Sequence, residues 1–69
     1  MTAMEVIANG NPVSLNDGAR LTDLLAALGL AEKWVVAERN GEAVNRADMG
    51  VTFLAEGDRI ELVRAVAGG

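Results

Sequence analysis

The chain has 69 residues, enough for one small domain and no more, because typical domains contain roughly 100–200 residues. Ten acidic and six basic residues give a net charge of −4, which argues against a nucleic-acid-binding surface, since such surfaces are usually basic. The chain has no cysteine and no histidine, so disulfides, thiolate or imidazole metal ligands, and Cys- or His-based catalysis are excluded. A self-contained enzyme is therefore not expected.

The N-terminal segment predicts a β-hairpin. Short apolar alternations at residues 4–8 and 11–15 flank Asn9-Gly10, a pair typical of tight two-residue turns. Pro12 cannot donate a hydrogen bond to a neighbouring strand, so the second strand should lie at a sheet edge. One face of the hairpin should carry the apolar side chains of both strands: Met4, Val6, Ala8, Val13 and Leu15.

A helix is predicted over residues 20–29. Four leucines at spacings i, i+3, i+4 and i+7 form one helical stripe: Leu21, Leu24, Leu25 and Leu28. Gly29 suits the left-handed residue after a helix, and Leu30 should fold back in a Schellman contact. The first residue of the helix stays open, because Arg20 is a poor cap and Thr22, a good one, follows the first leucine of the stripe.

The second half of the chain predicts further strands. Residues 34–39 form a third strand, where we expect Trp34 to be buried, and Asn40-Gly41 closes it with another tight turn. Residues 43–44 suffice for a short strand only. Residues 60–66 form the last strand, with Ile60 and Leu62 facing the core.

No helix or strand is predicted at the start of the segment between the short strand and the last strand. Residues 46–52 are predicted to be irregular, Phe53-Leu54 to form a buried turn, and residues 56–58 to make a tight turn before the last strand.

This order of elements predicts an α+β fold. The apolar face of the hairpin must be covered, and the single helix has one apolar stripe with which to cover it. A right-handed crossover then places the last strand parallel to the first. The result is the ubiquitin-like β-grasp arrangement, a mixed sheet of four to five strands in the order 2-1-5-3-4. We expect the domain to span residues 1–66 and residues 67–69 to form a flexible tail.

The tail, Ala67-Gly68-Gly69, carries the chemistry that we expect. Two glycines remove every side chain near the α-carboxylate, so a partner's narrow channel can close around bare backbone. Three extended residues reach about 10 Å beyond the strand. A carboxylate becomes an acylating agent as a mixed anhydride with AMP, and a sulfur nucleophile can then convert it to a thiocarboxylate. The alternative is that the two glycines are incidental, as in a frayed tail.

The residues in this order resemble the small sulfur carriers of thiamin biosynthesis (ThiS-type). The resemblance covers residues 4–69 and includes the following segments: the Asn9-Gly10 hairpin, residues 24–30, residues 36–44, residues 57–63 and Gly68-Gly69. Arg39 stands where that family commonly has an aliphatic residue, and Met49 where tryptophan is frequent. We expect these departures, on an edge strand and a loop, to bear on partner contacts more than on the fold.

The resemblance implies a function for the tail. Gly69 would be adenylated by an E1-like (ThiF-type) enzyme that uses ATP, with Gly68 and Ala67 recognised alongside it, and converted to the thiocarboxylate. A sulfur donor such as a cysteine desulfurase would supply the sulfur, and a thiazole synthase (ThiG-type) would receive it. The carrier itself would bind no cofactor.

The open face of the sheet is the expected docking surface. Val63 and Ala65 should point away from the helix near the tail, where ubiquitin-like proteins commonly dock partners. Arg59, Glu61 and Arg64 are expected either to contribute charged contacts at its rim or to be solvated surface. Three acidic residues are interpreted as turn or surface residues rather than metal ligands: Asp48, Glu56 and Asp58.

Other functions stay open on sequence grounds. The small subunit of molybdopterin synthase shares the fold and the Gly-Gly end, and other ubiquitin-like carriers or modifiers use the same chemistry. A plain β-grasp interaction domain is the alternative from a different class. No apolar run approaches the roughly 20 residues of a membrane span, and no basic segment precedes an apolar one at the N-terminus, so we expect a cytoplasmic protein.

Overall fold

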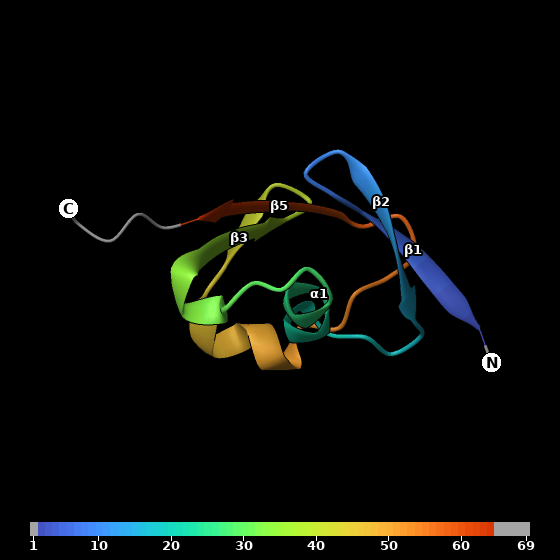
Figure 1. The fold of residues 1–69 in the computed structure, drawn as a ribbon, viewed down its shortest axis with the longest axis horizontal. Helices are drawn as coiled ribbons and strands as arrows, with labels where there is room; N and C mark the ends of the chain where they lie inside the picture. The colour runs from blue at the N-terminus through green and yellow to red at the C-terminus, as the bar shows by residue number, and fades with distance from the viewer. Residues whose placement is uncertain (1, 65–69) are drawn as a thin grey trace.

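A computed structural model describes residues 2–64, which form one five-stranded mixed sheet with helices on one face. The strand order is β2-β1-β5-β3-β4; β5 is parallel to β1, and all other neighbours are antiparallel. The predicted β-grasp order is therefore confirmed (Figure 1). The elements in chain order are β1 (Ala3–Ala8), β2 (Asn11–Asn16), α1 (Leu21–Ala27), η1 (Glu32–Trp34), β3 (Val35–Arg39), β4 (Glu42–Val44), η2 (Arg46–Val51) and β5 (Arg59–Arg64).

The first two strands form the predicted hairpin. Asn9 and Gly10 have φ angles of +50° and +84°, the left-handed pair that a two-residue turn of matching twist requires. Met4 faces Leu15 and Val6 faces Val13 across the two strands. Pro12 lies in β2, which is the sheet edge, so its missing N–H deprives no neighbouring strand of a hydrogen bond.

Helix α1 is shorter than predicted. Its N-cap is Arg20, a residue type whose side chain does not accept hydrogen bonds from the first turn of a helix. Asp23 stabilises this end of the helix instead, because its carboxylate accepts a hydrogen bond from the Arg20 N–H at 2.8 Å. The helix ends at Ala27, and Leu28, the last leucine of the predicted stripe, is 40% exposed because it caps the helix.

The C-terminal end of α1 is the predicted Schellman motif. Gly29 has φ +72°, its N–H donates to Ala26, and the Leu30 N–H donates to Leu25 at 2.9 Å. Leu30 thereby packs against the core.

The core lies between the sheet and the two helical segments α1 and η2, which pack against each other. Figure 1 shows both segments on the same side of the sheet, α1 in teal and η2 in orange. The largest fully buried side chains come from both layers: Val6, Leu21, Leu24, Leu25, Met49 and Ile60. The opposite face of the sheet carries no covering element among residues 2–64.

Three local expectations are wrong. Residues 46–51 form the 3₁₀ helix η2 instead of an irregular segment. Trp34 is 46% exposed, because the neighbouring Val35 takes the inward position where β3 begins. Phe53 is 55% exposed while Leu54 is buried, since this stretch runs extended beside Arg20 and successive side chains point to opposite sides.

Strand β5 is held on one side by the side chain of a turn residue. Strand β1 pairs with β5 only through Ile7 with Arg59 and Ala8 with Ile60. Beyond that point Asn9 continues the pairing: its N–H donates to Ile60, its Oδ1 accepts from the Leu62 N–H at 2.8 Å, and its Nδ2 donates to the Leu62 carbonyl at 3.1 Å. Asn9 thus serves both as turn residue and as the last rung of the parallel ladder.

The two roles of Asn9 can be separated by substitution. Asn9→Gly keeps the positive φ without strain but removes both side-chain bonds to Leu62, so the free energy of unfolding should fall by about 2 kcal/mol. Asn9→Ala adds the cost of a left-handed non-glycine residue, roughly 1–2 kcal/mol more. Urea unfolding measures both variants. Equal stability of the two variants, or no loss in Asn9→Gly, would contradict this assignment.

Candidate functional site: the open sheet face and the end of β5

The docking residues that the sequence predicts lie on two different faces of β5. Ile60 and Leu62 are buried toward the helix side, and the intervening residues Arg59, Glu61 and Val63 are exposed on the open face. Val63 is 63% exposed, as expected for a residue that points away from the core. Arg64 alternates back to the other face and is exposed there, so the structure separates it from the other three.

Val36 is a surface residue that the sequence interpretation missed. It is the direct cross-strand partner of Val63 and is 54% exposed, so the two valines form one apolar pair on the open face. Side chains alternate between the two faces along β3, and because Val35 and Ala37 are buried, Val36 between them points to the open face. This alternation was the signal that could have identified Val36. The open face near the end of β5 therefore carries more apolar surface than Val63 alone.

Glu61 has an unexpected neighbour. Its cross-strand partner on β3 is Glu38, also exposed, so two carboxylates of like charge occupy directly opposite positions. Arg59, two residues before Glu61 on the same face, is positioned through its backbone: its N–H donates to Asn40 Oδ1 at 2.9 Å and its carbonyl accepts from the Asn40 N–H at 2.8 Å.

The tail residues of the predicted site lie outside residues 2–64. This applies to Gly69, Gly68 and Ala67, and also to Ala65 of the predicted docking surface. Their roles, and the boundary between domain and tail, stay predictions. The described part ends at Arg64, in the central strand of the sheet, immediately before these residues.

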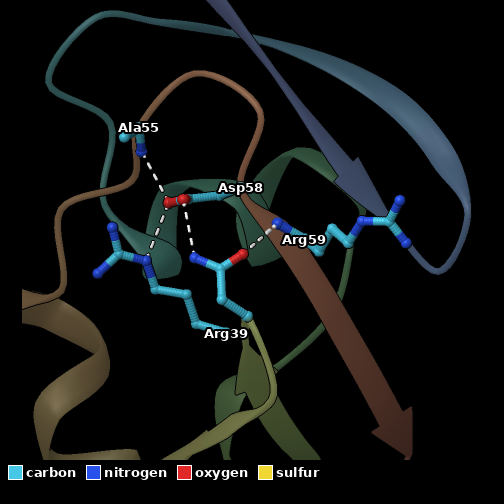
Figure 2. Close-up of polar contacts among 5 residues, drawn as sticks. Arg39, Ala55, Asp58 and Arg59 are labelled. Carbon is cyan, nitrogen blue, oxygen red and sulfur yellow. Dashed lines mark hydrogen bonds and ion pairs between the residues drawn. The ribbon is translucent and has the colours of Figure 1, made fainter.

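Asp58 anchors the start of β5. Its carboxylate accepts from Arg39 Nε at 2.9 Å, Asn40 Nδ2 at 3.1 Å and the Ala55 N–H at 2.8 Å, and Asp58 is only 7% exposed. Figure 2 shows Arg39 and Ala55 converging on this carboxylate from two different segments. The turn role expected for Asp58 is correct, with its N–H donating to the Ala55 carbonyl, but its partly buried ion pair with Arg39 was not predicted.

The surroundings of Asp58 keep it charged. Burial of the carboxyl alone would raise its pKa, but the hydrogen bonds from Asn40, Ala55 and Arg39, together with the Arg39 charge, lower the pKa below its ordinary value. The ionised carboxylate therefore ties the β3–β4 turn to the turn before β5.

Within the described range, no group of three or more acidic, histidine or cysteine side chains is placed to hold a metal ion. In the same range, no helix has the length and apolar character needed to cross a membrane.

The fold and this surface define a ubiquitin-like β-grasp protein, and comparison with known proteins narrows the class. A sequence model of the ThiS family matches residues 3–69. The chain therefore belongs to the ThiS family, and the resemblance to ThiS-type sulfur carriers is confirmed.

Solved structures agree with this assignment. The chain is similar to a thiamine biosynthesis protein (ThiS) from Geobacter metallireducens, known from a crystal structure and an NMR solution structure, at 32% identity. The crystal structure matches with a TM-score of 0.78, over 96% of this chain and 100% of that one. The NMR structure gives 0.75, over 96% and 88%.

A third relative is much longer. A thiazole synthase of Magnetococcus marinus is 39% identical over 66 residues, which are 96% of this chain but only 20% of that protein. The chain thus spans about a fifth of this curated relative.

Two departures from the family pattern turn out to serve internal packing. Arg39 lies in β3, an interior strand, and pairs with Asp58. Met49, in η2, is 1% exposed and fills the core beneath the sheet. The expected placement of these two positions, on an edge strand and in a loop, is therefore wrong for both, and their bearing on partner contacts stays a prediction.

The Asp58 contacts predict a specific pH dependence of stability. Because its pKa is lowered in the folded state, its contribution is complete above the unfolded pKa of about 4 and is lost as the pH falls through the folded value. Asp58→Asn should lower the free energy of unfolding by about 2 kcal/mol at pH 7, and by progressively less below about pH 4. Urea unfolding from pH 7 to pH 3 measures this difference.

The matched control is Asp48→Asn, which removes the same charge from an exposed residue and should change stability little. A deficit in Asp58→Asn that stays constant across this pH range would contradict the assignment.

Proposed function

We propose that this protein is the sulfur carrier for thiazole formation in thiamin biosynthesis and acts through its C-terminal Gly69. The observation that carries the proposal is the match to the ThiS family, which extends to residue 69 and so includes the Gly-Gly end. The position of β5 supports it, because this central strand of the sheet ends at Arg64, close in sequence to Gly69.

The proposed chemistry takes place at the terminal carboxylate. A carboxylate oxygen attacks the α-phosphate of ATP, pyrophosphate leaves, and an acyl adenylate forms. A persulfide sulfur on the donor then attacks the acyl carbon, AMP leaves, and an acyl disulfide forms. A partner thiolate attacks the donor's sulfur, the sulfur–sulfur bond breaks, the thiocarboxylate leaves, and the partner thiol and the donor end as a disulfide. The absence of cysteine and histidine from the chain supports assigning these steps to partners, an E1-like (ThiF-type) enzyme and a sulfur donor such as a cysteine desulfurase.

A thiazole synthase is the proposed acceptor of the sulfur. Support comes from the Magnetococcus marinus thiazole synthase, of which a fifth resembles this chain. A carrier-like segment joined to a synthase in one polypeptide would meet it at high effective concentration, which suits two proteins that act in sequence. The same relative favours the thiamin pathway over molybdopterin synthesis for this chain.

The open face of β5 is the proposed docking surface for these enzymes. Val63 and Val36 offer an exposed apolar pair beside the point where the tail begins, and Glu61 and Arg59 continue the face along the strand. Small apolar patches with charged neighbours are typical of surfaces that partners bind reversibly.

The test of the carrier chemistry uses the absence of cysteine. Any thiol-selective alkylation of this chain must report a sulfur introduced by modification. Protein produced together with its activating enzyme and sulfur source should be alkylated stoichiometrically, and peptide mapping should place the label on the peptide that ends in Gly69. The control is a chain that lacks Gly69. Alkylation no greater than in this control would refute the proposed function.

A further inference from the structure

The two Asn-Gly pairs that close turns of the sheet can also react with themselves. In such a pair the backbone nitrogen of the glycine can attack the side-chain amide carbon of the asparagine, because glycine has no side chain to hinder the approach. Asn9-Gly10 and Asn40-Gly41 have nearly identical geometry, with asparagine φ angles of +50° and +51°, and all of these residues are exposed. Water therefore reaches both pairs, and the contacts of each asparagine side chain distinguish them.

The reaction is deamidation, and water is its co-reactant. The Gly10 nitrogen loses its proton and bonds to the Asn9 amide carbon, the bond from this carbon to the side-chain nitrogen breaks, and ammonia leaves. Water then opens the resulting cyclic imide at either carbonyl, which gives aspartate or isoaspartate. The attacking group is available, because within residues 2–64 no hydrogen bond ties the Gly10 N–H to another segment.

The Asn9 side chain is held by neutral groups. Its Nδ2 donates to the Leu62 carbonyl at 3.1 Å, and its Oδ1 accepts from the Leu62 N–H at 2.8 Å. Both bonds must break before the amide carbon can turn toward the Gly10 nitrogen. The adjoining β1–β5 ladder consists of two residue pairs, so this end of the ladder can open locally.

The Asn40 side chain is held more strongly. Its Nδ2 donates to the Asp58 carboxylate at 3.1 Å, and its Oδ1 accepts from the Arg59 N–H at 2.9 Å. A hydrogen bond to an ionised acceptor is about twice as strong as one between neutral groups. The adjoining β3–β5 ladder has five residue pairs. The same dipeptide is therefore better protected at this turn.

We propose that Asn9 is a site of spontaneous deamidation in the folded protein, reached when its bonds to Leu62 open, and that the contacts of Asn40 protect Asn40-Gly41. Aspartate at position 9 has no N–H to donate and places a carboxylate oxygen beside the Leu62 carbonyl. Isoaspartate inserts an additional backbone carbon into a two-residue turn. Either product weakens the attachment of β5 to β1 irreversibly, and this inference does not depend on the proposed function.

Incubation of the wild-type protein in mildly alkaline buffer tests the proposal. Peptide mapping by mass spectrometry measures the deamidated fraction at each asparagine over time. In the folded chain Asn9 should react about fivefold faster than Asn40, the factor that corresponds to the additional strength of the hydrogen bond to a charged group. In concentrated urea the two sites should react at similar rates, and Asn9 at least about tenfold faster than in the folded chain.

Asp58→Asn tests the reason for the difference. This variant replaces the charged acceptor of Asn40 by a neutral one, so the ratio of the two rates should fall toward one. A general loss of stability affects both sites and does not by itself change the ratio. The matched control is Asp48→Asn, which removes the same charge from an exposed residue and should leave the ratio as in the wild-type protein.

The effect on β5 is measured on the deamidated protein itself. Each event adds one negative charge to a chain of net charge −4, so ion exchange separates the product. Its unfolding midpoint should lie about 4–8 °C below that of the unmodified chain. Asn9→Asp, which reproduces the aspartate product, should show a loss of the same size.

Four results would overturn the inference. They are deamidation in the folded chain that is as fast at Asn40 as at Asn9, equal rates at Asn9 in the folded and unfolded chains, no reaction at Asn9 while the unfolded chain reacts, and a deamidated protein as stable as the unmodified one. None of them bears on the carrier chemistry, which the alkylation of Gly69 tests separately.

Discussion

The hydrogen bonds that hold β5 between β1 and β3 are the constraint on which the rest of the structure depends. Asn9 completes the short parallel pairing on one side, and Asn40 pairs with the backbone of Arg59 on the other. Both asparagines sit in left-handed turn positions, where their short side chains reach the neighbouring backbone. Asp58 fixes the start of the same strand through Arg39. Because β5 is hydrogen-bonded on both sides and fixed at its start, the position of its last residue, Arg64, is fixed relative to the sheet.

The parts of the fold with local signals could be predicted from the sequence. The two Asn-Gly turns, the leucine stripe and the Gly29 cap each depend on neighbouring residues, and together they determine the strand order. The features that the sequence did not predict depend on how segments pack against one another in the folded protein. Trp34 and Phe53 are exposed because adjacent residues took the inward positions, and the burial of Met49 depends on where η2 meets α1. The Asp58 ion pair and the Glu38–Glu61 pair arise from the register of distant strands, which single-residue patterns do not contain.

The two faces of the sheet differ: one packs against the core, and the other carries the proposed docking surface. The helix side holds the apolar core, and there Met49 packs in the core and Arg39 pairs with Asp58. The open side carries two exposed cross-strand pairs, Val36 with Val63 and Glu38 with Glu61. This arrangement would suit the proposed carrier, which several enzymes would bind in turn.

Transfer of labelled sulfur from the carrier to a heterocycle tests the central claim most directly. The wild-type chain is loaded with ³⁴S at its C-terminus and mixed with thiazole synthase and its small-molecule substrates, or with the large subunit of molybdopterin synthase and its precursor. The account predicts that ³⁴S appears in the thiazole product and leaves the protein. Label that stays on the chain in the presence of active synthase, or that enters only the molybdopterin product, would contradict it.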